Sequence, residues 1–304
     1  MIRFSRLNLE NKSSRFRKLT SFIPLTLRRK TGRLLFDRLF LPPRRTGKRL
    51  KDHSGDYGHG YCYEQAFCAD SYDIEKAVVL CRAAGPSVLD LAGGAGRFAE
   101  QAVGQGLTVT LIDLSEQMLQ GARQKRNRLS TVEKSRFSIQ RQDIAQLDLP
   151  DRFDSVLSLN NGLEHLPSRG AIAETLRRVY RQLRKDGRLI VDVHNPAFWT
   201  ERNQWKKGEW LFSHHFFWEE KKIFVWERTN KTPLAESTVN WEHALSHDFR
   251  HYTRLQTTIQ LLGAEEWLVL FSANGFRVES CWGDWHENAV AANRLKLVFT
   301  LKKI

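Results

Sequence analysis

The segment from Val88 to Glu100, VLDLAGGAGRFAE, constrains the fold of this chain most strongly. Three apolar residues and an aspartate precede a loop of glycine and alanine, and the residues after the loop favour a helix. This outline is typical of a buried parallel strand whose carboxyl end turns directly into a helix. A loop without large side chains lets a ligand approach the backbone closely. The segment therefore predicts a ligand site at the carboxyl end of a buried strand.

The apolar residues from position 72 onward alternate between a helical and an extended period. This pattern predicts helices over 71–85, 96–106, 115–129, 168–187 and 263–275. It predicts strands over 87–92, 107–114, 136–143, 153–161, 188–195, 276–284 and 294–304. Alternating strands and helices build right-handed crossovers. The expected fold is therefore α/β: a doubly wound, mostly parallel sheet of seven strands with helices on both faces.

The segment 196–262 interrupts this alternation and contains six of the nine tryptophans. Its runs 210–218, 221–229 and 254–262 look like antiparallel strands joined by polar turns. We expect a small antiparallel sheet here, inserted as a substrate lid between the fifth and sixth strands. The main domain would then comprise 52–195 and 263–304, with 196–262 as the lid.

The net charge of +14 is confined to the first 51 residues. This segment holds 16 lysines and arginines and two acidic residues, whereas the rest holds 32 of each sign. Its Arg-rich, acid-poor composition leaves three interpretations open: a patch for a membrane surface or an acidic partner, a cleaved organelle-import leader, or an arm with no special role. We treat 1–51 as a basic N-terminal extension.

The charged residues and motifs around the glycine loop limit the classes of ligand that it can bind. A P-loop needs Gly-Lys followed by Ser or Thr, but Arg97 and Phe98 follow Gly96, which excludes nucleoside triphosphate hydrolysis. Asp113, at the end of the second expected strand, suits a ribose in either a dinucleotide or an S-adenosylmethionine site. Asp90 discriminates between them, because its carboxylate would repel a pyrophosphate and attract the ammonium of a methionine group.

Five segments, in order, resemble the motifs of class I S-adenosylmethionine-dependent methyltransferases. They are DLAGGAG, IDLSEQMLQGAR, QDIAQL, FDSVLSLNNGLEHLP and LRKDGRLIVDV. The resemblance covers roughly residues 72–304, and Ala92 departs from it where the family has a glycine. It implies a small-molecule methyltransferase with S-adenosyl-L-methionine as cofactor. The implied cofactor contacts are Asp90, Ala92, Gly93, Gly94 and Gly96 for the methionine part, Asp113 for the ribose, Leu114, Met118, Asp143 and Ile144 for the adenine, and Asn160 after the fourth strand.

Methyl transfer to an oxygen or nitrogen acceptor is an in-line displacement, and it needs a general base only where the acceptor carries a proton. The candidates at the ends of the fourth and fifth strands are Glu164, His165 and His194. The step Glu164-His165 resembles that of the ubiquinone-biosynthesis O-methyltransferases, in which it holds a metal. Asn161 stands where that pattern has an acid, so we predict no metal. Unranked acceptor-side candidates in the inserted segment are His214, His215, Trp218 and His251.

Two other functions compete with the small-molecule enzyme. A tRNA or other RNA methyltransferase could use the basic extension to hold phosphates, but the remainder of the chain is charge-neutral, so nucleic acid is the weaker prediction. A catalytically silent binding subunit of the same fold is the other alternative. Four cysteines without a CxxC pair indicate a reducing compartment, so we predict a cytoplasmic protein that could associate with a membrane. The sequence leaves the oligomeric state open.

Overall fold

The computed structural model describes residues 64, 71–201, 210–218, 220–231, 237–249 and 253–304. The basic extension 1–51, its proposed boundary and His251 lie outside these residues. None of the described helices has both the length and the apolar composition that crossing a bilayer requires.

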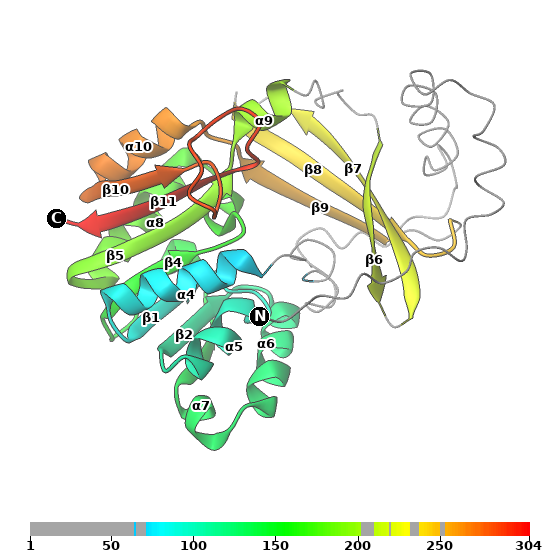
Figure 1. Cartoon of the computed structure of the whole chain (residues 1–304). Coiled ribbons are helices and arrows are strands. Elements are labelled where there is room, and N and C mark those ends of the chain that lie inside the picture. Colours follow the sequence, from blue (N-terminus) through cyan, green and yellow to red (C-terminus); the bar gives the residue numbers. More distant parts are fainter. Residues whose placement is uncertain (1–63, 65–70, 202–209, 219, 232–236, 250–252) are drawn as a thin grey trace, which may run out of the picture. The chain divides into compact units, whose positions relative to one another are not determined.

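Seven strands form one sheet in the order β10-β11-β5-β4-β1-β2-β3 (Figure 1). The strands are β1 Ser87–Leu91, β2 Thr108–Asp113, β3 Phe137–Arg141, β4 Phe153–Ser158, β5 Leu183–His194, β10 Phe276–Trp282 and β11 Lys296–Lys303. All neighbouring pairs from β3 to β5 are parallel, whereas β11 runs antiparallel to both β5 and β10. The predicted seven-stranded, mostly parallel sheet is thus confirmed.

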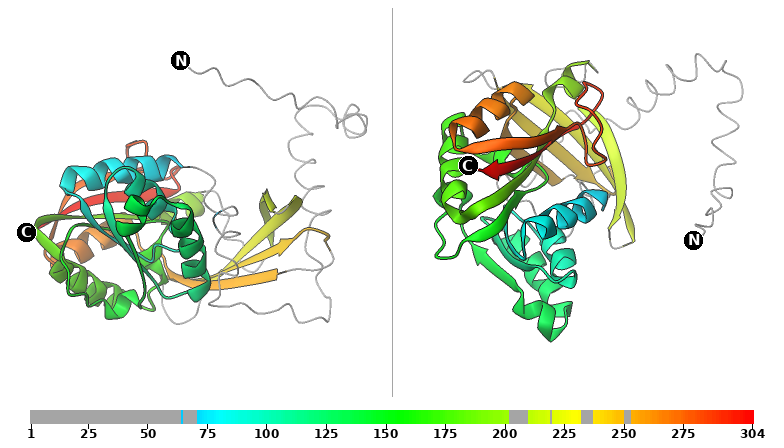
Figure 2. Two further views of the ribbon diagram at one scale, coloured as in Figure 1. Left: turned by 90° about the horizontal axis from the view of Figure 1, so that it is seen from below. Right: turned by 60° about the vertical axis from the view of Figure 1, so that its left-hand side comes forward.

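Helices cover both faces of this sheet (Figure 2). The helices α4 and α5 and part of α6 pack with Val88 of β1 in one apolar cluster, and α8 and α10 pack with Leu89 and Leu91 in another. Successive residues of β1 therefore point to opposite buried faces, as a central parallel strand requires. The helices are α4 Tyr72–Ala84, α5 Arg97–Gly104, α6 Glu116–Arg128, α7 Thr131–Ser135, α8 Arg169–Gln182, α9 Pro196–Glu201 and α10 Ala264–Ala273, with short 3-10 turns η1 Ile144–Gln146 and η2 Gly162–His165.

One predicted boundary is wrong. The helix expected over 168–187 ends at Gln182, and β5 begins at Leu183 rather than at Arg188. Leu183 is 1% exposed and pairs with Phe153 of β4, so burial in the core outweighs the helical pattern of the sequence. Gly187, the last residue of the expected helix, lies inside the strand, where a Cβ would lie 3.0 Å from the Arg184 carbonyl oxygen.

A second, antiparallel sheet follows β5 along the chain, in the order β6-β7-β8-β9. Its strands are β6 Leu211–Trp218, β7 Lys221–Lys231, β8 Thr238–Ser246 and β9 Thr253–Gln260. The runs expected from the sequence account for β6, β7 and β9, and β8 is the additional strand. The β8 sequence has the apolar residues Val239, Trp241 and Leu245 at alternate positions, interrupted by His243, although Glu242, Ala244 and Ser246 are buried as well. This alternation is the signal that would have identified β8.

Candidate active site

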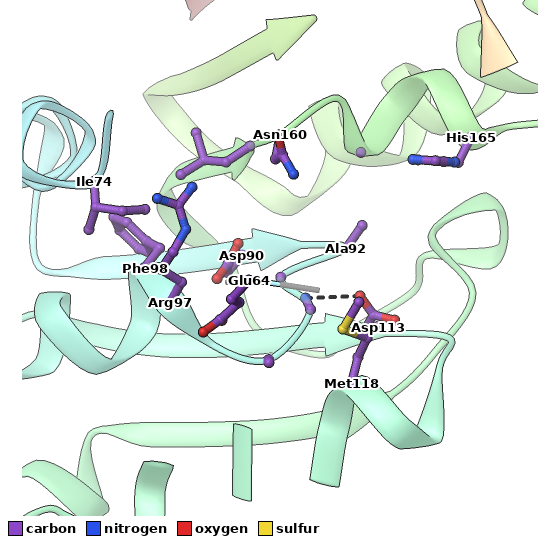
Figure 3. A pocket seen from close by; sticks show the side chains of 15 residues that line it. Glu64, Ile74, Asp90, Ala92, Arg97, Phe98, Asp113, Met118, Asn160 and His165 are labelled. Carbon is purple, nitrogen blue, oxygen red and sulfur yellow. Dashed lines mark hydrogen bonds between the residues drawn. The ribbon is translucent and has the colours of Figure 1, made fainter. Parts of the chain in front are cut away.

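The glycine loop forms the floor of a pocket at the carboxyl ends of β1, β2 and β4 (Figure 3). Its lining includes eight of the residues expected from the sequence: Asp90, Ala92, Gly93, Gly94, Asp113, Met118, Asn160 and His165. Strands β1 and β4 are adjacent in the sheet, with β2 and β3 on one side of the pair and β5 on the other. Ligands of open α/β sheets bind at such a point, where the strand order reverses.

The loop conformation depends on small residues. Ala92 and Gly94 have φ values of 52° and 57°, in the left-handed region that glycine adopts most easily. At Gly93 a Cβ would lie 2.6 Å from Asp90 Oδ2 and 2.7 Å from Leu111 Cγ. The loop can therefore lie close to Asp90 only because this position lacks a side chain.

Asp90 is the most unusual group of the pocket. Its side chain is 2% exposed, and its Oδ2 atom has no hydrogen-bond partner among the described residues. The pKa of Asp90 is raised to about 8, mainly by burial and also by the nearby Asp113, with Arg97 opposing the shift. A buried carboxylate without a partner is costly unless a ligand supplies a donor or a positive charge. The oxygen thus fits an ammonium group.

Asp113 lies on the opposite side of the loop and fixes its backbone. Its Oδ2 accepts the Gly94 N–H at 2.9 Å (Figure 3), and its Oδ1 accepts the Ser115 N–H at 2.8 Å. Burial raises the pKa of Asp113, and the backbone N–H groups partly counteract this. Each carboxylate oxygen has a second lone pair, so both can also accept from ribose hydroxyls. Ser115 caps α6, accepting from the Met118 N–H.

Four residues that were expected to contact the cofactor lie outside the pocket lining. Gly96 is the N-cap residue of α5, and the space for a Cβ there is occupied by Phe137 and Ala122 at 3.2 and 3.3 Å. The others are Leu114, which is 57% exposed, Asp143, whose Oδ1 caps η1 through the Ala145 N–H, and Ile144, which is buried in the core.

Several lining residues were missed by the sequence reasoning. Arg97 and Phe98 directly follow the glycine loop, so their position in the sequence was an available signal. Arg97 is held by a bidentate ion pair with Asp73 of α4. Glu64 also lines the pocket and pairs with Lys125 at 2.5 Å, a contact between distant segments that no local pattern indicates. The remaining missed residues are Ile74, Ala95, Leu159 and Gly162.

The turn after β4 is braced from β5 and β11. Asn160 and Asn161 both have positive φ, at 51° and 68°. Asp192 Oδ1 accepts the Asn161 N–H at 3.0 Å, and Lys296 Nζ donates to Asn161 Oδ1 at 2.7 Å. Trp285 donates its indole N–H to the other Asp192 oxygen. This buried network holds Asn160 at the pocket wall.

The three catalytic candidates lie at the same end of the sheet. His165 lines the pocket, and its Nδ1 is 3.0 Å from Thr257 Oγ1 of β9. The ring is exposed toward the pocket, but the surrounding protein lowers its pKa to about 4, with His194 adding to the effect. Glu164 is fully buried behind it and accepts from the His194 backbone N–H at 3.1 Å and from His194 Nδ1 at 2.5 Å. His165 is therefore neutral at neutral pH, and Glu164 orients the His194 ring.

No group of three or more His, Cys, Asp or Glu residues is arranged to hold a metal ion in the described part of the chain. The donor set of the pocket instead suits an organic ligand: an unpartnered carboxylate, a glycine backbone and the apolar Met118 wall.

Comparison with known proteins agrees with this geometry. Residues 88–187 match the model of the methyltransferase domain family. A protein of Geobacillus sp. (strain WCH70) whose name assigns it to the methyltransferases is 24% identical over 264 residues, 80% of this chain and 97% of that protein. The CcbJ methyltransferase of Streptomyces caelestis has a similar structure, with a TM-score of 0.66 at 20% identity over 77% of this chain and 89% of the other. The amino pentose methyltransferase CalS10 of Micromonospora echinaspora, solved with S-adenosylmethionine bound, has a TM-score of 0.59 at 17% identity over 82% and 98%.

The sheet order, the glycine loop with its two aspartates, and the matched domain together define an enzyme class. The chain carries a methyltransferase domain, and its fold is that of the class I S-adenosylmethionine-dependent methyltransferases.

Proposed function

We propose that this enzyme methylates an oxygen or nitrogen atom of a small molecule. S-adenosylmethionine supplies the electrophilic methyl group when bound. The unpartnered Asp90 oxygen facing the glycine loop is the observation that carries the proposal, because it complements the ammonium of the methionine part. Asp113 would accept from the ribose hydroxyls, and Met118 would pack against the adenine.

The acceptor would bind between the pocket and the small sheet. His165 of η2 contacts Thr257 of β9, and the His194 ring lies 5.0 Å from the Trp241 ring of β8. Side chains of both sheets therefore meet beside the pocket, where they can exclude water and align the acceptor. The amino pentose methyltransferase CalS10, which shares the fold, supports an acceptor of this size.

His194 is the base that the geometry favours for an acceptor that must lose a proton. Glu164 accepts from Nδ1, which leaves the lone pair of the neutral ring on Nε2. The carboxylate also stabilises the ring once it takes up a proton. His165, with its low pKa, would serve as a neutral hydrogen-bond partner of the acceptor.

Methylation of pooled metabolites, followed with labelled S-adenosylmethionine and with tRNA as the competing substrate class, tests the function. We expect label in a small molecule and none in tRNA. His194→Gln should lower kcat by about 10²- to 10⁴-fold, because general-base catalysis contributes about that much. The affinity for S-adenosylhomocysteine should not change. Labelled tRNA, or full activity of the variant, would contradict the proposal or the assigned base.

A further inference from the structure

One face of the small sheet carries a polar group between two apolar clusters. Residues 239, 241, 243 and 245 of β8 share this face, and Glu227 of β7 is paired with His243 in the register. Val225, Leu245 and Phe216 form one cluster, and Val239, Trp241 and Ile259 form the other. Glu227 and His243 lie between them, and His214 of β6 is close enough to His243 to lower its pKa.

This face adjoins the candidate active site. The Trp241 ring lies 5.0 Å from His194 and stacks on His243 at 5.5 Å with 22° between the planes. Thr257, the β9 partner of Trp241 in the register, contacts His165, which lines the cofactor pocket. The polar group is thus connected to both histidines of the site through direct contacts.

Glu227 has no protein cation to balance its charge within the described residues. Burial raises its pKa to about 7, although the nearby polar groups of Trp241 and Ser213 partly counteract this. The nearest basic atom is His243 Nε2 at 4.0 Å, but burial together with His214 and His194 lowers the pKa of His243 to about 3, so this ring is neutral. In the same part of the chain, no lysine or arginine forms an ion pair with Glu227.

The neighbouring position shows the contrasting arrangement. Glu242, on the opposite face of β8, is 4% exposed and accepts from Arg228 Nη2 at 2.8 Å. The sheet therefore supplies a cation to the buried Glu242 and none to Glu227, whose side chain is 22% exposed. A carboxylate without a protein cation beside it is complementary to a positive charge that a ligand brings.

We propose that Glu227 binds a protonated amine of the methyl acceptor, with the rings of Trp241 and His243 as the adjoining walls. The inference rests on the proposed function and deepens it, because it assigns the acceptor to the amines. Aromatic faces also attract an ammonium group, which adds to the preference over a neutral hydroxyl. Glu227 determines the specificity for an amine, and His194 remains the residue that accepts the proton.

The test compares matched ligands on the full chain loaded with S-adenosylhomocysteine. The probes are benzylamine with benzyl alcohol, cyclohexylamine with cyclohexanol, and 2-amino-2-deoxyglucose with glucose, with binding measured by calorimetry. We expect at least one amine to bind about tenfold or more tightly than its alcohol at about pH 8, because the charged Glu227 accepts a charge-assisted hydrogen bond from the ammonium group. The preference should shrink at about pH 6, because Glu227, with a pKa of about 7, then holds a proton.

Glu227→Gln should abolish this preference, and Glu220→Gln is the matched control. Glu220 is exposed in the turn between β6 and β7, so this variant removes the same charge from the same sheet outside the face. In the wild type, the bound amine should also lower the midpoint of the Glu227 titration, followed by NMR of the side-chain carboxyl carbon. No amine preference in any pair, a preference that survives Glu227→Gln, or an unchanged midpoint would overturn the inference.

The cofactor separates the two proposals. Wild-type chain that fails to bind S-adenosylhomocysteine contradicts the proposed function. Normal cofactor binding without an amine preference contradicts only the role of Glu227. Equal cofactor affinity in Glu227→Gln and wild type shows in addition that the variant is folded.

Discussion

Asp90 combines a buried position with an unpartnered oxygen, and this combination makes it the best single test of the cofactor site. In Asp90→Asn the shape is kept and the charge is removed. We expect the affinity for S-adenosylhomocysteine to fall by about 10- to 100-fold, corresponding to about 1.5–3 kcal/mol for a hydrogen bond between charged groups. Calorimetric titration of both proteins measures this. Equal affinities would show that Asp90 does not hold the ammonium.

Asp90→Asn weakens cofactor binding, but it should raise the free energy of unfolding of the ligand-free protein relative to the wild type. The pKa of Asp90 is about 8 in the folded state and about 3.8 when unperturbed, so the unfolded chain gives up this proton first as the pH rises. The Asp90 carboxyl therefore lowers the free energy of unfolding progressively between about pH 4 and about pH 8. The asparagine side chain of the variant does not titrate, so Asp90→Asn should become more stable than the wild type across this window.

Urea unfolding without ligand at about pH 5 and pH 8 checks this sign. We expect the variant to gain more than about 1 kcal/mol relative to the wild type over the interval, since one pKa unit corresponds to about 1.4 kcal/mol. A constant difference between the proteins at both pH values would show that the Asp90 pKa is not raised.

At the scale of the elements, the glycine loop offers two substitutions of equal size in different surroundings. Gly93→Ala forces a Cβ to within 2.6 Å of Asp90 Oδ2, whereas at Gly94 the nearest atom, Met118 Sδ, is 3.8 Å away. Gly94→Ala therefore costs only the left-handed backbone strain, about 1–2 kcal/mol. Gly93 has no positive φ, but Asp90 and Leu111 must move to make room for a Cβ there, and overpacking of this kind costs about 1–3 kcal/mol. We expect Gly93→Ala to cost at least as much as Gly94→Ala.

Thermal and urea unfolding of the two ligand-free variants compares these costs. The wild type provides the common reference. A larger loss for Gly94→Ala than for Gly93→Ala would mean that backbone strain, rather than the Asp90 contact, makes the loop depend on glycine.

The sequence predicted the elements whose pattern is local and periodic. β1, with its glycine loop, and the capped helix α6 were identified because each carries its own signal of strand, turn or cap. The end of α8 was misplaced because Leu183 joins β5 through its pairing with Phe153, 30 residues earlier in the chain. Long-range pairing of this kind leaves no periodic trace in a short window.

The residues of the candidate site likewise differ in whether the sequence predicts them. Asp90 and Asp113 could be predicted, because both stand at the ends of recognisable strands. The bracing of the Asn160 turn by Lys296 and the charge imbalance at Glu227 could not, because they depend on which side chains of separate strands meet. Burial and pairing between distant segments are properties of the packed structure, so they cannot be read from a short stretch of sequence.

On the scale of the whole molecule, the two sheets are joined by contacts that can be removed singly. Gln260, at the end of β9, is 3% exposed and donates to the Pro167 carbonyl oxygen at 3.2 Å. Gln260→Ala should destabilise the small sheet by about 0.5–1.5 kcal/mol for each hydrogen bond lost, because it removes the bond to Pro167 and a second one to Thr238 within the sheet. Deuterium exchange should increase in β8 and β9 and stay unchanged in β1 and β4.

Thr258→Ala is the control for this prediction. Thr258 donates to Asn240 within the small sheet and is exposed, so its loss removes a hydrogen bond without uncoupling the two sheets. Its effect on exchange should be smaller. Faster exchange throughout both sheets in Gln260→Ala would show that they open as one cooperative unit instead.

The position of β11 constrains the order in which the enzyme can assemble during synthesis. β10 is made first, but it joins the sheet only through β11, which lies between it and β5. Lys296, on the same strand, braces the turn beside the pocket. A growing chain that ends at β10 therefore has an unpaired strand edge and lacks the Lys296 brace beside the methyl-donor site, and an edge of this kind is open to wrong pairings until β11 inserts.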